Sequence, residues 1–432
     1  MKILLVNPPN SGRDVAFEKF GLNSGESIFR GEPLCLETIA GPLDSHDVMI
    51  LDLKVAGEDL DATLSRFQPE VVGLTAVTCE ANTVIRLCEH IKQHSQSIQV
   101  VVGGMHASND PEFFNRPNID YIVIGLGKAS FKQLIDRLDT GRPVDDIPGV
   151  AVCHAGSNLQ IKVRSYCKED LVEDAAPRYD LVSHYRNHYF IPSLKVSMGF
   201  IATAFGCPYS CTFCCIGAVT GRRYITHTIK NVIRDIALLD DSPLIRLVDA
   251  NTFGDIKRAR LLSDEIRRAQ IKKQFIVDAC VETIVKAPDL FKEWRDIGMR
   301  GVVIGFEEID NDILAGWQKK NTLDTIKKSI DILKNLGISI IGDFVVSPSY
   351  SERDFLKLGE FLRRSNIDVP VIAVLTPLPG TRLHESVRSK IVNHDLDYYS
   401  FANAVMPTHM PERDFYEHLI ALRRDANEHS KL

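Results

Sequence analysis

Four cysteines stand close together in the middle of the chain, in the stretch "GCPYSCTFCC". Cys207, Cys211 and Cys214 have the spacing C-x3-C-x2-C, and thiolates are ligands of both zinc and iron–sulfur clusters. A structural zinc site has four ligands, and no downstream C-x2-C or H-x3-H motif supplies a second pair. Three thiolates would leave one iron of a [4Fe–4S] cluster without a protein ligand. The spacing therefore predicts a cluster with an open iron position, as a reactive site requires.

Two other interpretations of these cysteines are weaker. The first residues, "MKILLVNPPN", are typical of a β-strand stopped by prolines and not of a signal peptide, so we expect a reducing, cytoplasmic setting in which disulfides are rare. Buried free cysteines are common singly, but four lie within nine residues here. Cys215 is assigned to packing by default, with a spare ligand or a redox thiol as alternatives.

Composition narrows the class of protein. The 432 residues favour two or more domains, and 44% hydrophobic with 25% charged residues is typical of a globular protein. A net charge of −6 indicates no general affinity for nucleic acids or anionic membranes. No apolar run is long enough to span a bilayer. These features exclude nucleic acid as an expected partner.

Residues 1–140 alternate apolar Val/Ile-rich runs with amphipathic segments, a pattern that predicts a doubly wound α/β domain with a parallel sheet. In such a fold, ligands bind at the carboxyl ends of the strands. Strands are predicted at 2–9, 48–53, 70–77, 98–104 and 120–125, and helices at 33–43, 59–67, 81–94 and 128–138.

The remainder of the chain divides into three parts. Residues 141–194 form a connector, in which "GVAVCHAGSNLQIKV" predicts a hairpin. Residues 195–385 contain six further strand–helix units, which predict a partial (β/α)6 barrel whose site lies at the strand carboxyl ends. Residues 386–432 form a short, partly helical tail. The six barrel strands are predicted at 195–204, 244–250, 275–282, 301–308, 338–346 and 369–377.

The cysteine motif resembles the signature of the radical S-adenosylmethionine (SAM) enzymes. This resemblance implies that Cys207, Cys211 and Cys214 ligate a [4Fe–4S] cluster and that Phe213 lies beside it. It also implies that the open iron chelates the amino and carboxylate groups of SAM, which is cleaved to a 5′-deoxyadenosyl radical.

Other barrel segments carry the same resemblance. "GVVIGFEEID" places Glu307 near the ribose or amino group of SAM. "LVDANTFGD" places Asp249 and Asn251 near the methionyl end or the substrate, and "VLTPLPGTRLHE" packs by the adenine. Where the family often has arginine at the end of the third strand, this chain has Glu282, a departure that concerns substrate recognition. Taken alone, these polar residues could equally be helix caps or members of surface ion pairs.

The N-terminal half resembles the cobalamin-binding domains that precede radical SAM barrels. The segments that carry this resemblance are "NPP", "GEPLCLETIAGPL", "VVGLTAVT", "VVGGMHAS" and "DYIVIGLGK". Taken alone, the Gly pair in "VVGGMHASNDPE" predicts only a tight turn after a strand. The resemblance implies a Rossmann-like cobalamin domain in which the following residues bind the cofactor: Thr75, Thr78, Gly103, Gly104, Met105, His106, Gly125 and Gly127.

Two departures from that family are visible. The usual Gly-Glu-Gly-Glu loop is replaced by Gly-Leu-Gly-Lys, which ends at Lys128. Residues 7–32 contain no histidine, so we expect cobalt to lack a histidine ligand from this loop. His106 is expected to be a solvated residue or to contact the cobalamin tail.

Together the two resemblances imply a cobalamin-dependent radical SAM C-methyltransferase (class B). One SAM would methylate cobalamin and a second would supply the radical that activates an unactivated carbon. The resemblance extends to the glutamine C-methyltransferases of methyl-coenzyme M reductase, with small-molecule, lipid and tetrapyrrole methylases as alternatives. The expected partners are a peptide, protein or small-molecule substrate and an electron donor such as flavodoxin or ferredoxin.

Three other functions remain open at this point. A cobalamin-dependent radical SAM enzyme could close or contract a ring without methyl transfer. A methylthiotransferase would need three further cysteines in the N-terminal half, where only Cys35, Cys79 and Cys88 lie. A non-enzymatic iron–sulfur sensor would not cleave SAM.

Overall fold

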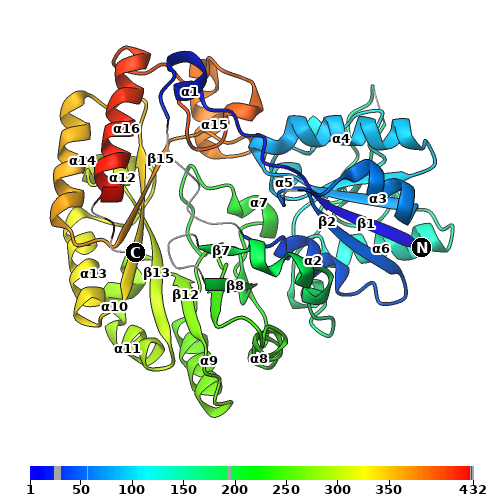
Figure 1. The fold of residues 1–432 in the computed structure, drawn as a ribbon, viewed down its shortest axis with the longest axis horizontal. Helices are drawn as coiled ribbons and strands as arrows, with labels where there is room; N and C mark the ends of the chain where they lie inside the picture. The colour runs from blue at the N-terminus through cyan, green and yellow to red at the C-terminus, as the bar shows by residue number, and fades with distance from the viewer. Residues whose placement is uncertain (24–30, 56, 155, 192–195, 429, 431–432) are drawn as a thin grey trace.

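A computed structural model describes residues 1–23, 31–55, 57–154, 156–191, 196–428 and 430. The chain forms two α/β lobes that lie side by side, with the N-terminal lobe on the right in Figure 1. Among the described residues, no helix is both long enough and apolar enough to cross a membrane. The predicted α/β class, with a doubly wound domain ahead of a partial barrel, is confirmed.

The N-terminal lobe is built on a six-stranded sheet with the order β2-β1-β3-β4-β5-β6. Strands β1 to β5 are parallel, and side chains alternate between the two faces. Ile3 and Leu5 pack against α2 and α6, whereas Leu4 and Val6 pack against α3 and α4. The bounds are β1 Lys2–Asn7, β2 Asp47–Asp52, β3 Val71–Thr75, β4 Gln99–Gly103, β5 Tyr121–Val123, α2 Leu34–Ala40, α3 Leu60–Phe67, α4 Ala81–His94 and α6 Lys128–Asp139.

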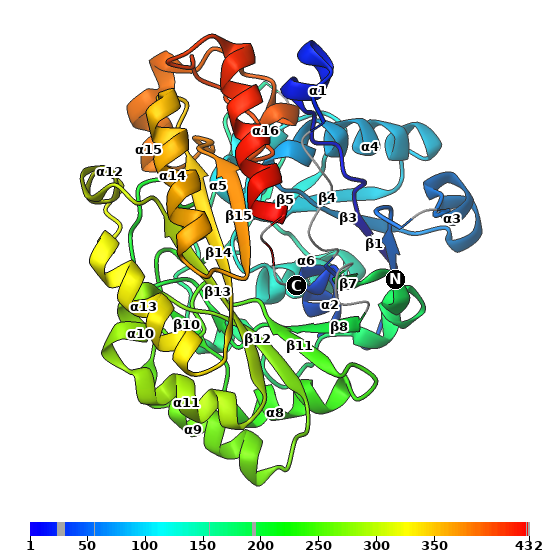
Figure 2. The same ribbon diagram turned by 60° about the vertical axis from the view of Figure 1, so that its left-hand side comes forward.

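The second lobe contains a seven-stranded sheet with the order β15-β14-β13-β12-β11-β8-β7. Six strands are parallel and correspond to the six that the sequence predicts. Helices cover the outer side of this curved, open sheet, as Figure 2 shows. The bounds are β8 Val196–Ile201, β11 Leu244–Leu247, β12 Gln274–Asp278, β13 Met299–Glu307, β14 Ser339–Val346, β15 Val369–Val374, α8 Ile229–Leu238, α9 Ile256–Arg268, α10 Val281–Lys286, α11 Pro288–Asp296, α13 Leu323–Asn335 and α14 Glu352–Arg364.

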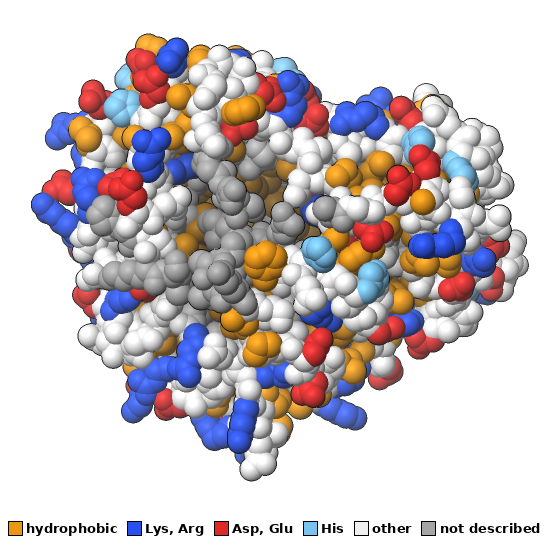
Figure 3. Space-filling view, in the orientation of Figure 1, with side chains coloured by type: hydrophobic (Ala, Val, Ile, Leu, Met, Phe, Trp, Pro, Cys, Tyr) orange, Lys and Arg blue, Asp and Glu red, His pale blue; other side chains and the backbone are white. Residues whose placement is uncertain are grey.

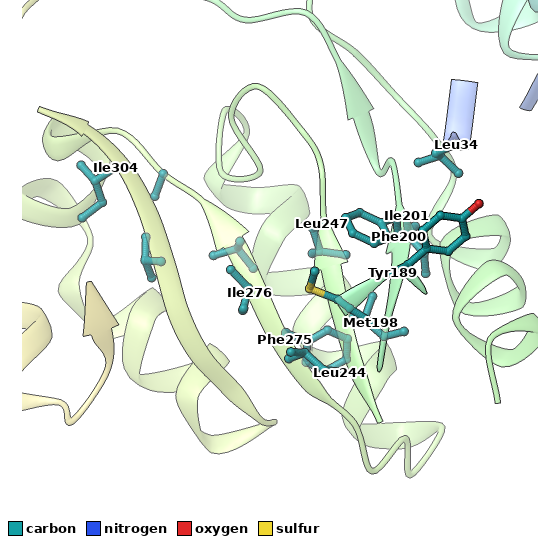
Figure 4. Packing of buried hydrophobic residues seen from close by; sticks show 14 of the residues in the cluster. Leu34, Tyr189, Met198, Phe200, Ile201, Leu244, Leu247, Phe275, Ile276 and Ile304 are labelled. Atoms are coloured by element: carbon teal, nitrogen blue, oxygen red, sulfur yellow. The ribbon is translucent and has the colours of Figure 1, made fainter. Parts of the chain in front are cut away.

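The two lobes share one continuous hydrophobic core. Figure 4 shows Leu34 of α2 beside Phe200 and Ile201 of β8. Buried polar contacts reinforce this interface, because Glu32 accepts a hydrogen bond of 2.7 Å from the Phe200 amide and forms an ion pair with Arg186. The first barrel strand is therefore held against the N-terminal lobe, which fixes the loop that follows it.

The predicted hairpin in the connector is wrong. Strand β6 (Val150–Val152) adds antiparallel to β5 at the edge of the N-terminal sheet, which thus continues past Thr140. The expected second arm, at 159–163, forms no strand in the described chain, and Val163 is 83% exposed. The edge of β5 offers a complete hydrogen-bonding partner to β6, whereas two apolar side chains of the second arm, Ile161 and Val163, stay exposed. Ala155, which precedes the expected Gly-Ser-Asn turn at 156–158, lies outside the described residues.

The C-terminal segment connects the lobes. Helix α16 (Glu412–Glu428) packs against α14 and β15, and a 3₁₀ turn at Leu396–Tyr398 packs against the start of α4. The buried side chain of Asn403 accepts a hydrogen bond of 2.8 Å from the Val15 amide and donates one of 2.8 Å to the Arg13 carbonyl. Asn403 thus ties the segment after the barrel to the N-terminal segment. The helix that the sequence predicts in this tail is α16.

Candidate cofactor and active site

The cysteine loop leaves the sheet at the carboxyl end of β8. Thr203 and Ala204 begin it, and Asp249 holds both. Its carboxylate accepts hydrogen bonds of 2.6 and 2.8 Å from their amides and of 2.7 Å from the Thr203 hydroxyl. A short strand pair, β9 (Ala204–Phe205) with β10 (Ile225–Thr226), then orients the loop. The Asp249 carboxylate thus makes its hydrogen bonds within the protein and positions the loop. The family resemblance predicted this residue near SAM or the substrate.

A cavity of about 280 Å³ opens on this loop. It brings together Cys207, Cys211 and Cys214 with three other predicted site residues: Phe213, Glu282 and Glu307. Among the described residues, no three His, Cys, Asp or Glu side chains lie close enough to hold a single metal ion. Three cysteines of one short loop that line one cavity are the set of thiols that the sequence predicts as ligands of an iron–sulfur cluster.

The thiols require a positive charge to ionise. Burial raises the pKa of Cys214 to about 12, and it also raises the pKa values of Cys207 and Cys211. Iron would supply that charge, because metal ligation deprotonates thiols. Lys319 favours the thiolates of Cys207 and Cys211 as well. The sequence analysis missed Lys319, since "QKK" gives no signal that separates a buried lysine from solvated ones.

Glu307 stands in an unusual backbone conformation at the end of β13. Its φ angle is +71°, a left-handed value that is costly for a residue with a side chain, and the register with β14 shifts there. The carboxylate enters the cavity and accepts a 2.7 Å bond from Lys319. The next residue, Glu308, points away and pairs with the hydroxyl of Tyr350. The backbone twist therefore selects Glu307 for the cavity.

This arrangement yields a matched test of the SAM site. Glu307→Gln removes the charge that faces Lys319, and we expect SAM to bind about tenfold more weakly while the iron content is unchanged. Glu308→Gln keeps the contact with Tyr350 and is expected to bind SAM normally. Isothermal titration under anaerobic conditions measures both affinities. Equal affinities for the two variants would contradict the assignment of Glu307.

Asn251 carries an unsatisfied amide beside the site. Its side chain is 1% exposed, and neither the oxygen nor the nitrogen has a partner among the described residues. Buried amides without partners are costly, so a ligand that completes their hydrogen bonds gains affinity. Asn251 does not itself line the cavity, but the adjacent Ala250 does. The orphaned amide fits the predicted role near SAM or the substrate.

A second cavity, of about 410 Å³, lies between the two lobes. Figure 3 shows the surface hollowed there, with hydrophobic side chains along the hollow. The predicted cobalamin residues that line it are Thr75, Gly103, Gly104, Met105, Gly125 and Gly127. The barrel lobe contributes the opposite wall, including Ala204, Phe205, Val219 and Val248. A largely apolar slot closed by both lobes would suit the flat corrin ring of cobalamin.

The loop after β4 needs glycine at position 104. The φ angle of Gly104 is +96°, and a Cβ atom there would lie 2.6 Å from Thr75 Oγ1 and 2.7 Å from the Ala76 nitrogen. A side chain would therefore push β3 and β4 apart at the floor of the cavity. Of the remaining predictions, Thr78 is buried in a 3₁₀ turn and lies outside the residues that line the cavity.

The prediction that His106 is solvated is wrong. Its ring is fully buried and packs edge-on against Phe113 and Phe114, at centroid distances of 5.1 and 5.5 Å. Burial lowers its pKa to about 4, so the ring is neutral at pH 7. His106 does not line the cavity between the lobes either. His106 is the second residue of α5 (Met105–Asn109), which begins directly after Gly104. This helix directs the His106 side chain into the core instead of toward the slot.

Lys128, at the end of the unusual Gly-Leu-Gly-Lys loop, also serves the lobe interface. Its side chain is 3% exposed and donates a 2.6 Å hydrogen bond to the Ala175 carbonyl of the connector. Burial lowers its pKa to about 8. This lysine therefore anchors the connector against the N-terminal lobe.

The cysteines of the N-terminal half do not form a second cluster site. Cys35 lies on α2 and lines the larger cavity, whereas Cys88 is fully buried on α4, on the opposite face of the sheet. A sheet between them prevents a shared cluster. Cys35 and Cys88 therefore cannot both ligate the second cluster that a methylthiotransferase would need in this lobe.

The two cavities adjoin. Ile216, which opens α7 (Ile216–Thr220), and Ala250, which follows β11, line both of them. A ligand in the slot between the lobes would therefore lie next to a ligand over the cysteine loop. Chemistry that passes a group from one cofactor region to a molecule activated at the other requires this proximity.

Known protein families match both lobes. Residues 25–135 match the B12 binding domain and residues 201–362 match the radical SAM superfamily. The hopanoid C-3 methylase of Methylococcus capsulatus is 26% identical over 403 residues, which cover 91% of this chain and 76% of that protein. An uncharacterized methyltransferase of Pyrococcus horikoshii is 28% identical over 406 residues, with 89% and 83% covered.

A solved structure shares the whole architecture. The radical SAM methyltransferase TsrM from Kitasatospora setae, solved with cobalamin and a [4Fe–4S] cluster bound, superposes with a TM-score of 0.73. The superposition covers 98% of this chain and 90% of that chain at 17% identity, so it establishes a common fold. The likeness includes both lobes and the way they are joined.

Proposed function

From the premise that this chain belongs to the cobalamin-dependent radical SAM methyltransferase family, we propose that it methylates an unactivated carbon with two molecules of SAM per turnover. The observation that carries this proposal is the contact between the two cavities at Ile216 and Ala250. Bound cobalamin would carry the methyl group from one SAM, and the reduced cluster would cleave the other to the radical that activates the substrate.

The residues of the chain divide the work of binding. Cys207, Cys211 and Cys214 would hold the cluster, with Asp249 fixing the start of their loop. Glu307 and Lys319 form a charged pair that can bind the amino and carboxylate ends of SAM. Both side chains are at least four-fifths buried, which strengthens these contacts relative to water.

The slot between the lobes would hold cobalamin without a histidine ligand. Among the described residues that line it there is no histidine, and His106 is buried elsewhere. Cobalamin held there would supply a nucleophilic cobalt that accepts the methyl group of SAM. Apolar walls also exclude water from the reaction.

The substrate is proposed to enter as a small molecule or as a single side chain of a peptide. The cavity over the cysteine loop, at about 280 Å³, is at the small end of ligand sites, and SAM would take part of it. Glu282, Gln318 and Asn321 also line it, so the site offers hydrogen-bond donors and acceptors to a polar, neutral group. A glutamine side chain, as in methyl-coenzyme M reductase, meets both conditions.

The decisive experiment is an anaerobic product assay. The protein is reconstituted with iron, sulfide and hydroxocobalamin, reduced with a chemical donor or with flavodoxin or ferredoxin, and supplied with SAM. Formation of S-adenosylhomocysteine together with 5′-deoxyadenosine, measured by mass spectrometry, is the expected result. 5′-Deoxyadenosine alone, with cobalamin bound, would replace the proposal with a radical enzyme that does not transfer methyl groups.

A further inference from the structure

A fourth cysteine faces the cluster site from the neighbouring strand. Cys280 follows β12 and caps α10, and it lines the same cavity as the three cysteines of the loop. Its thiol interacts electrostatically with those of Cys207 and Cys211 and with the ammonium of Lys319. The cavity thus contains four cysteines, of which the C-x3-C-x2-C motif accounts for three.

Cys280 has no structural role that explains its position. Among the described residues its thiol makes no hydrogen bond, whereas the nearby Tyr209 hydroxyl donates a 2.9 Å bond to Glu282. Cys88 and Cys215 pack into hydrophobic clusters, but Cys280 belongs to none of them. A half-buried thiol that borders a cavity without packing or pairing is available to a ligand in that cavity.

We propose that Cys280 is a displaceable fourth protein ligand of the [4Fe–4S] cluster. Before SAM binds, its thiolate occupies the iron that the loop cysteines leave open. When SAM arrives, the Fe–S bond to Cys280 breaks, bonds from iron to the amino and carboxylate groups of SAM form, and Cys280 Sγ takes up the proton that the SAM ammonium releases. No electron is gained or lost. The inference rests on the proposed cluster ligation by the loop cysteines and is independent of the methylated substrate.

The surroundings of Cys280 suit such an exchange. Lys319 lines the same cavity, so its ammonium would stabilise a thiolate on Cys280 while iron is bound. The same lysine pairs with Glu307, which the proposed function assigns to SAM. Arrival of SAM would therefore draw Lys319 toward the carboxylate of the ligand and weaken its support for the thiolate. Cys280 would thus protect the open iron until SAM binds.

The test uses the full-length protein reconstituted anaerobically with ⁵⁷Fe and compares wild type with Cys280→Ala, Cys280→Ser and Cys215→Ala. Mössbauer and electron paramagnetic resonance spectra are recorded with and without SAM. Wild type and Cys215→Ala are expected to show four sulfur-ligated irons without SAM, and the two Cys280 variants one distinct iron. All four spectra should become alike when SAM is bound. SAM should bind the Cys280→Ala protein about tenfold more tightly, because no ligand must be displaced.

Two results would overturn the proposal: identical spectra of wild type and the Cys280 variants without SAM, or an unchanged affinity for SAM in both variants. If Cys280→Ala does not assemble a cluster, Cys280→Ser, which keeps the side-chain size, provides the comparison. Failure of the underlying cluster assignment is distinguishable, because a variant with Cys207, Cys211 and Cys214 all replaced by alanine would then retain its full iron content.

Discussion

Replacement of Cys211 by alanine is expected to remove most of the iron from the reconstituted protein and to lower 5′-deoxyadenosine formation to background. The three thiolates act as a unit, so the loss of one is expected to cost nearly as much activity as the loss of all three. The rate of 5′-deoxyadenosine formation should therefore fall more than about a thousandfold. S-adenosylhomocysteine formation should fall with it, because the reduced cluster and cobalamin share one cavity system. Iron analysis and mass spectrometry of the nucleosides measure these outcomes.

The matched control for this prediction is Cys215→Ala. Cys215 belongs to the same loop, but its side chain packs against the hydrophobic core of the N-terminal lobe and does not line the cysteine cavity. This variant should retain its iron and its products, with only a modest loss of stability from the smaller side chain. Loss of iron in Cys215→Ala, or its retention in Cys211→Ala, would show that the cluster uses a different set of thiolates.

Much of this architecture could be predicted from the sequence because it follows from local patterns. Continuous Val/Ile runs such as Ile3–Val6 mark buried parallel strands, and their two-residue alternation places side chains on both faces. The cysteine spacing is also local, since a tight loop brings its own thiols together. The structure accordingly places Cys207, Cys211 and Cys214 in one cavity.

The sequence could not predict which polar residues at strand ends would face the ligand. Asp249, Asn251 and Glu307 all follow apolar strands, yet Asp249 is satisfied by the Thr203 and Ala204 amides. Glu307 enters the cavity only because its backbone adopts a left-handed conformation. Such choices depend on contacts between distant segments, which neither spacing nor periodicity encodes.

Residues outside any motif were missed for the same reason. Lys319 and Cys280 are separated by 39 positions in the sequence but act on one another across the cavity. His106 illustrates the converse, because its neighbours in the Gly-rich segment line the ligand slot while its own ring is buried against Phe113. A single sequence shows that these side chains exist but not which of them meet.

Replacement of Gly104 by alanine is expected to weaken cobalamin binding at least about tenfold without changing the iron content. The new Cβ would lie within 2.7 Å of the Thr75 hydroxyl and the Ala76 nitrogen, and backbone atoms cannot yield as a flexible side chain can. Relief requires β3 and β4 to separate at the floor of the slot. The cluster should still assemble, because its cysteines belong to the other lobe.

Gly141→Ala separates the effect of this collision from that of backbone strain. Gly141 also has a left-handed backbone, with φ +61°, but a Cβ there would meet nothing within 4 Å. Both variants should lose about 1–2 kcal/mol of stability from the positive φ angle, as urea unfolding would measure. Only Gly104→Ala should lose cobalamin, as measured by the ratio of bound cobalamin to protein after gel filtration. Equal cobalamin content in the two variants would mean that the slot between the lobes is not the cobalamin site.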